Sequence, residues 1–210
     1  MNMRQLQPGS PVFFGRYPQG AEGEVQPIEW QVLEVRENRA LLLSRYVLDM
    51  QPFHSETGCV RWIDTTVCQW LRETFLPTAF SREEQAEIHH PDPKADPNED
   101  FLTWLLLGGE ERIDDPVFLL STEEVGQYFP NDIGHYHTGS AARMTPWVGA
   151  TYPDVSQVNG NVCWWLRSSS SQYPYASIVS PVDTLGASLV DPDNRQGVRP
   201  AIWVMTDAGR

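Results

Sequence analysis

The first part of the chain alternates apolar and polar positions. Residues 28–32 read Ile-Glu-Trp-Gln-Val, the period of two expected of a strand with one buried face. Residues 40–43 form a second short apolar run, and the polar residues 36–39 lie between the two as a turn would. Together these segments predict a β-hairpin.

After Asp64 the apolar positions follow a helical period instead: Val67, Trp70, Leu71 and Phe75. Asp64 or Thr65 is a candidate N-cap, and Pro77 is expected to follow the end of this helix. Capping boxes beginning at Ser81 and Ser121 predict two further helices. Helices and strands alternate without a βαβ rhythm, which favours an α+β fold over a doubly wound sheet.

An apolar strand is expected at residues 117–120, before the helix that Ser121 begins. The last fifty residues change character again, with four more strands expected at residues 162–167, 176–179, 184–190 and 198–204. Ser, Pro and Asp turn signals separate the last four, which predicts short antiparallel strands with polar tips. Pro200 has no N–H for a ladder, so the final strand should be an edge or bulged there.

Composition supports one folded domain over residues 1–210. Apolar residues make up 40% of the chain and include eight Trp, enough for a substantial core. The net charge of −13 excludes nucleic acid as a natural partner, because such binding needs a basic surface. The first 15 residues lack an apolar signal core and no segment approaches the ~18 apolar residues of a membrane span, so a cytoplasmic location without membrane partners is expected.

Residues 89–116 form an acidic, Pro-bearing insertion. Residues 83–124 hold 13 carboxylates against Lys94 and Arg112, typical of a solvated face. The alternative is that this acidic segment docks a basic partner in a structural or regulatory role. The apolar run at residues 101–107 is expected to be buried against the core rather than exposed.

Candidate chemistry is sparse. The spacing of Cys59, Cys68 and Cys163 matches no zinc or redox motif, which predicts buried, reduced thiols. No nucleophile elbow, His-Glu-x-x-His or phosphate loop occurs. Three neighbouring residues could ligate a metal but are better interpreted as a polar loop: Asp132, His135 and His137. We therefore expect no catalytic residue, metal or cofactor.

Seven ordered blocks carry a family resemblance. They are FGRYPQ (14–19), PIEWQVL (27–33), ALLLS (40–44), Trp70-Leu71 with Phe75 and Ala79-Phe80-Ser81, VFLLS (117–121), WWLRS (164–168) and GVRPA (197–201). Together they resemble a bacterial domain family related to the formylglycine-generating-enzyme branch of the C-type-lectin fold. The resemblance runs from about Gly15 to Val204. It implies a C-type-lectin-like mixed fold whose last strands and turns form a solvent-facing ligand platform.

Related domains include the variable proteins of diversity-generating retroelements, in which codons just before an ending like Gly197-Val198-Arg199 are rewritten. Of the 28 residues from Ser168 to Arg195, 13 are Ser, Tyr, Asp or Asn, types reached from Asn codons by changing adenines and favoured in binding loops. Turn chemistry alone would also favour Ser and Asp, so diversification stays open. The conformation of the local turn also stays open, because this chain has Ser169-Ser170 where the family often has Pro-Gly.

We expect this chain to be a non-catalytic binder of a protein or glycan through residues 168–195, the display segment. The candidate ligand-binding residues are Ser171, Gln172, Tyr173, Tyr175, Ser188, Asp191, Asp193 and Asn194. Kinship suggests an oxidase as the alternative, but that chemistry needs two cysteines and only Cys163 lies in this region. A calcium site at residues 191–194 is less favoured than a turn. Arg167 and Arg199 are expected to hydrogen-bond loop carbonyls, and Trp164, Trp165 and Trp203 to lie in the core.

Overall fold

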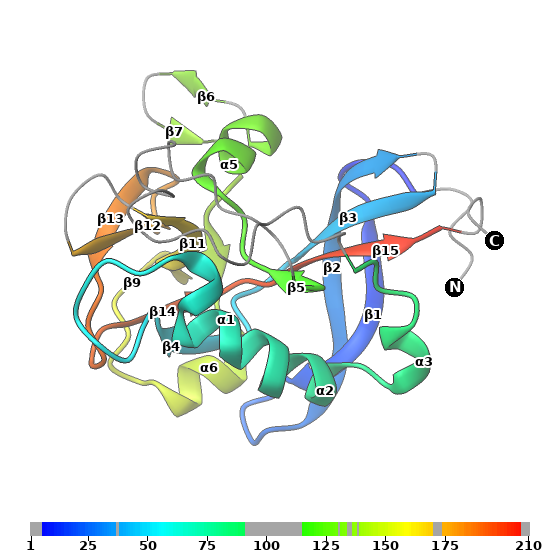
Figure 1. Ribbon diagram of the computed structural model, residues 1–210, viewed down its shortest axis with the longest axis horizontal. Coiled ribbons are helices and arrows are strands. Elements are labelled where there is room, and N and C mark those ends of the chain that lie inside the picture. Colours follow the sequence, from blue (N-terminus) through cyan, green and yellow to red (C-terminus); the bar gives the residue numbers. More distant parts are fainter. Residues whose placement is uncertain are drawn as a thin grey trace.

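A computed structural model describes residues 6–36, 38–90, 115–129, 131–133, 136–137, 139–169 and 174–206 (Figure 1). Two five-stranded sheets lie next to each other, with short helices packed along them. The predicted α+β class is confirmed at this level: the structure consists mainly of strands with a few short helices. None of the described helices is long and apolar enough to span a bilayer.

The first sheet has the strand order β1-β2-β3-β15-β5, with every neighbouring pair antiparallel. Its strands are β1 (Pro11–Pro18), β2 (Val25–Arg36), β3 (Arg39–Ser44), β15 (Ala201–Met205) and β5 (Val117–Phe118). The predicted hairpin is confirmed as β2 and β3, in which Val32 lies opposite Leu42.

The second sheet has the order β13-β12-β11-β14-β4. Its strands are β13 (Leu185–Leu189), β12 (Tyr175–Val179), β11 (Trp164–Ser169), β14 (Arg195–Val198) and β4 (Asp49–Pro52). The prediction of antiparallel C-terminal strands holds for β11, β12 and β13 but is wrong for β11 and β14, which pair in parallel with Trp164 opposite Gly197. Smaller ladders join β8 (Ala142–Arg143), β10 (Asn161–Val162) and β9 (Gln157–Val158), and β6 (Asn131–Ile133) with β7 (Tyr136–His137).

The described helices are η1 (Trp62–Asp64), α1 (Thr66–Trp70), η2 (Leu71–Phe75), α2 (Leu76–Ala79), α3 (Arg82–Gln85), α5 (Thr122–Tyr128) and α6 (Pro146–Thr151). Of these, α1, α3 and α5 begin where the sequence predicts, whereas α6 was not predicted. Thr65 caps α1 by accepting from the Cys68 N–H, and both predicted capping boxes are present. The expectation that Pro77 follows the helix is wrong: η2 is a π-helical turn, and Pro77 lies in the first turn of α2, where a missing N–H costs little.

Two of the places where the chain crosses from one sheet to the other are bonded to each other. One joins β3 to β4 and the other joins β14 to β15. The Ser44 N–H donates to the Pro200 carbonyl at 2.9 Å, and the Leu48 N–H donates to the Val198 carbonyl at 3.0 Å. The prediction that Pro200 marks an edge or bulge is therefore wrong: the strand ends there, and β15 is internal to the first sheet.

The core fills the space between the sheets and under the helices. Trp164 and Trp165 are fully buried, as predicted, whereas Trp203 is half-buried beneath the guanidinium groups of Arg36 and Arg39 at 4.8 and 4.9 Å. Most of the acidic insertion, including the apolar run at 101–107, lies outside the described residues.

Candidate functional site

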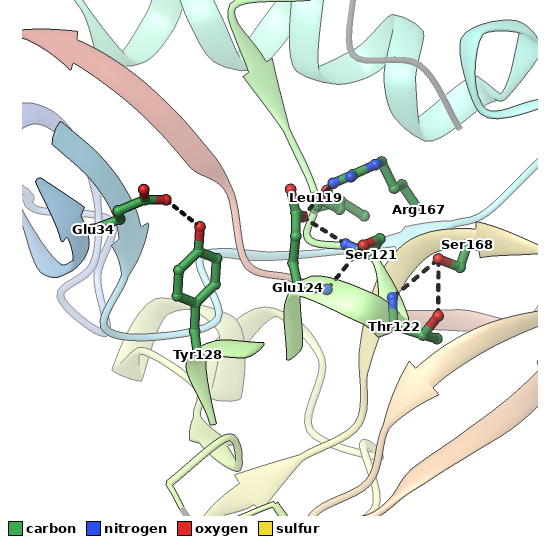
Figure 2. Close-up of polar contacts among 8 residues, drawn as sticks. All are labelled: Glu34, Leu119, Ser121, Thr122, Glu124, Tyr128, Arg167 and Ser168. Carbon is green, nitrogen blue, oxygen red and sulfur yellow. Dashed lines mark hydrogen bonds and ion pairs between the residues drawn. The ribbon is translucent and has the colours of Figure 1, made fainter. Parts of the chain in front are cut away.

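Helix α5 holds the beginning of the display segment (Figure 2). The Arg167 Nη1 donates to Glu124 Oε2 at 2.5 Å and to the Leu119 carbonyl at 2.8 Å. The same Glu124 oxygen accepts from the Ser121 N–H at 2.9 Å. One carboxylate therefore closes the cap of α5 and binds the guanidinium that precedes residue 168.

Ser168 is the first residue of the segment, and it is bonded to the first turn of α5. Its Oγ accepts from the Thr122 N–H at 3.0 Å and lies 3.4 Å from the Thr122 Oγ1. At the other end of α5 the Tyr128 hydroxyl donates to Glu34 of β2 at 2.6 Å, and burial together with this carboxylate raises the pKa of Tyr128. Helix α5 thus connects the two sheets (Figure 2).

A second polar network holds the end of the segment. The Gln196 Nε2 donates to Ser188 Oγ at 3.1 Å and to Asn194 Oδ1 at 2.9 Å. The Asn194 Nδ2 donates to Ser188 Oγ at 2.9 Å and also to the Leu189 carbonyl. Ser188 and Asn194, which were predicted to contact ligand, are half-buried and take part in this hydrogen-bond network.

Residues 191–194 form the predicted turn. Asp191 Oδ1 accepts from the Asp193 N–H at 2.9 Å, and the Asn194 N–H donates to the Asp191 carbonyl at 3.1 Å. The other oxygen of Asp191 accepts from the Thr57 hydroxyl at 3.3 Å. Asp193 is exposed and its carboxylate faces solvent, so within this turn it is the residue best placed to meet a partner.

Between the two ends, the hairpin of β12 and β13 exposes apolar side chains. Tyr175 is 38% exposed and lies opposite Leu189, also 38% exposed. Leu185 and Val182 are 37% and 49% exposed. Sequence reasoning selected Tyr175 but missed the other three, because alternation alone does not reveal that β13 is an edge. Ser171, Gln172 and Tyr173 lie outside the described residues.

Acidic groups predominate in the display segment. It contains Asp183, Asp191 and Asp193, and one basic residue, Arg195, which is exposed at its end. Asp183 adopts a positive φ of 60° and turns inward, where its carboxylate accepts from the Ser140 hydroxyl at 2.9 Å and from the Ala141 N–H. The exposed part of the segment therefore combines apolar side chains with the Asp193 carboxylate and the Arg195 guanidinium.

Both arginines that were predicted to hydrogen-bond loop carbonyls do so. Arg167 bonds Leu119 as described above, and Arg199 donates to the Ser44 carbonyl at 2.8 Å and to the Ser140 carbonyl at 3.0 Å. Arg199 is 2% exposed and stacks on Trp164. Burial, with Arg45 nearby, lowers the pKa of Arg199. This side chain holds the crossing between the sheets.

The cysteines occupy three different environments. Cys68 is buried with its Sγ 3.0 Å from an Asp115 oxygen, and Cys163 is half-buried. Cys59 is exposed, which corrects the prediction that all three are buried. Burial raises the pKa of the Cys163 thiol, which disfavours the thiolate needed for metal binding or nucleophilic attack.

The described residues contain no group of three or more His, Cys, Asp or Glu arranged to hold a metal ion. The side chains of Asp132, His135 and His137 fall outside the part of the chain whose side chains are described.

Comparison with known proteins gives one match. The model of a family described as Domain of unknown function (DUF6273) matches residues 37–206. This range includes the crossings, α5 and the whole display segment, and the chain belongs to this family. No curated protein and no solved structure matches the chain.

Proposed function

We propose that this member of the DUF6273 family is a non-catalytic ligand-binding domain that recognises a protein or glycan through residues 168–195. We further propose that its fold is C-type-lectin-like. The seven sequence blocks support this, as does the arrangement of two sheets that exchange strands near a bonded crossing.

The observation that carries the proposal is the contrast between the ends of the segment and its middle. Both ends are bonded to distant parts of the chain, whereas the middle exposes apolar groups. Among the described residues, nine large hydrophobic side chains are exposed, and four of them belong to this one hairpin: Tyr175, Val182, Leu185 and Leu189. Clustered apolar groups with a polar surround are typical of binding surfaces.

The test is a double substitution, Tyr175→Ala with Leu189→Ala, compared with Phe13→Ala. Phe13 is 60% exposed on β1, far from the hairpin, and serves as the matched control. We expect the double variant to lose capture of partners from lysate and glycan arrays while its melting temperature changes little. The control should keep both. If the double variant binds normally, or if the Phe13 variant loses the same ligands, the hairpin is not the binding surface.

We also propose that this chain is the variable protein of a diversity-generating retroelement. The support is compositional: 13 of 28 residues in the segment are Ser, Tyr, Asp or Asn. A reverse transcriptase gene and a near-copy of the coding sequence for residues 168–199 should lie nearby, with differences confined to template adenines. Their absence would leave a binder of fixed specificity.

The cytoplasm remains the proposed location. The Cys59 thiol is free and exposed. Exposed free thiols persist best in a reducing compartment, which supports this proposal.

A further inference from the structure

Strand β13 differs from the other edges of the two large sheets. Edge strands of natural proteins are blunted by shortness, proline, charge or a bulge, because an open edge pairs with other chains. Strand β1 has Pro11, Pro18 and a register shift before Arg16. Strand β5 is two residues long, and β4 is four residues long and ends at Pro52.

Strand β13 is one residue longer than β4 and has no proline, charge or bulge. Its five residues are Leu-Gly-Ala-Ser-Leu, without charge or proline. They pair with β12 through five consecutive residue pairs without a register shift. Four of the five, all except Ser188, are exposed. The strand is a regular, uncharged and solvent-facing edge.

The alternation of hydrogen-bonded pairs along β12 and β13 shows which backbone groups of β13 face outward. The Val190 N–H donates to the Pro174 carbonyl and the Ser180 N–H donates to the Thr184 carbonyl, both at 2.8 Å. Hydrogen-bonded pairs alternate along an antiparallel ladder, so Gly186 and Ser188 face β12. The N–H and C=O groups of Leu185, Ala187 and Leu189 therefore face the open edge, and the Leu189 carbonyl also accepts from the Asn194 side chain.

Charge identifies the kind of partner. Asp183 precedes β13, and Asp191 and Asp193 follow it. Asp183 is bonded inward, whereas Asp193 is exposed. The chain as a whole carries a net charge of −13. Arg195 is also exposed after the turn, but the three carboxylates outnumber it, so Lys or Arg is favoured over Asp or Glu at the ends of a strand added to β13.

We propose that β13 is a site of β-strand addition, and that its occupant is an extended peptide segment of a partner protein with alternating apolar residues and basic ends. This inference rests on the proposed binding function and specifies its partner. Residues opposite Leu185, Ala187 and Leu189 exchange backbone hydrogen bonds with them, and their side chains lie on the same face of the sheet as Tyr175.

A labelled probe peptide, Lys-Lys-Val-Thr-Val-Thr-Val-Lys-Lys, tests the register by fluorescence anisotropy at low salt. The valines are the residues that should face Leu185, Ala187 and Leu189. N-methylation of the valines should weaken binding at least about tenfold, because it removes the amide donors directed at β13. N-methylation of the threonines should have little effect, and replacing the lysines with glutamates should abolish binding.

A protein variant tests the same geometry from the other side. Ala187→Pro removes an outward N–H that the β12 ladder does not use, and proline is tolerated at such edge positions. Phe13→Ala, on the edge strand β1 of the other sheet, is the control. We expect the proline variant to lose probe binding at least about tenfold with a nearly unchanged melt, and the Phe13 variant to bind normally.

Three results would overturn strand addition. The first is no saturable binding of the basic probe up to about 1 mM. The second is equal effects of the two methylation patterns. The third is a concentration-dependent dimer that Ala187→Pro abolishes, which would mean that β13 pairs with a second copy. If Ala187→Pro keeps partner capture that Tyr175→Ala with Leu189→Ala loses, the binding function stands and strand addition is wrong.

Discussion

Replacing Glu124 with Gln removes the charge that Arg167 depends on while keeping the shape of the side chain. The side chains of Arg167 and Glu124 are 8% and 21% exposed, and their contact is 2.5 Å long. A hydrogen bond between charged groups contributes about 1.5–3 kcal/mol, more than a neutral one. Gln still serves a capping box, so the Ser121 bonds should survive. The free energy of unfolding should therefore fall by about 2 kcal/mol.

For a chain of this size, that loss lowers the melting temperature by roughly 4–8 °C. Urea unfolding followed by tryptophan fluorescence measures the free energy, and calorimetry measures the melting temperature. Glu123→Gln is the matched control, because Glu123 lies in the same turn of α5 and is exposed. We expect that control to change stability by less than about 0.5 kcal/mol.

A double-mutant cycle with Arg167→Leu isolates the pair. Removing Glu124's charge alone leaves a buried guanidinium with a weakened partner, whereas removing both partners relieves that cost. The double variant should therefore be more stable than the sum of the two single losses predicts. If Glu124→Gln costs no more than Glu123→Gln, or if the two changes are additive, the pair does not hold the beginning of the segment.

Two further predictions concern the close packing at Gly197 and the pH dependence of stability. Gly197→Ala should destabilise the protein by at least about 1–3 kcal/mol in urea unfolding, because the new Cβ would lie 2.7 Å from Val47 Cγ1, whereas Gly186→Ala should cost less. Burial and Asp49 raise the pKa of Tyr17. Above about pH 10 the unfolded chain therefore loses the Tyr17 proton while the native state keeps it. The free energy of unfolding should be unaffected by this group below about pH 10 and should fall as the pH rises further. Tyr17→Phe should flatten that alkaline decline in melting temperature, and an unchanged slope would contradict the role given to Tyr17.

Local signals predicted the elements of the fold well. The capping boxes at Ser81 and Ser121 begin α3 and α5, and Thr65 caps α1. These signals are readable because donor and acceptor are three residues apart in sequence. The alternation in residues 28–32 identifies β2 because that strand buries one face. In each case the physical cause lies within a few residues of the signal.

The features that local sequence patterns did not predict depend on contacts between residues far apart in the chain. The pairing of Trp164 with Gly197 is parallel, which no local pattern in either strand encodes. Pro200 ends a strand because the chain changes sheets there, and the proof is a bond from Ser44, 156 positions earlier. The exposure of Leu185 and Leu189 depends on the edge position of β13, which among the described strands pairs with β12 alone. This position is a property of the sheet rather than of the strand.

The residues of the candidate site likewise fall into two groups, those with long-range contacts and those exposed within one hairpin. Residues that hold the display segment bond to distant parts of the chain: Ser168 to Thr122, and Arg199 to Ser44. Tyr175 and Leu189 instead lie opposite each other in one hairpin and are both more than a third exposed. Exposed substitutions typically change stability by less than about 0.5 kcal/mol, whereas loss of a buried hydrogen-bonded group costs several times more. Selection on folding therefore constrains the buried and hydrogen-bonded residues of the segment strongly and the exposed side chains of the hairpin weakly. That asymmetry would let the exposed residues of the proposed binding surface change while the fold persists.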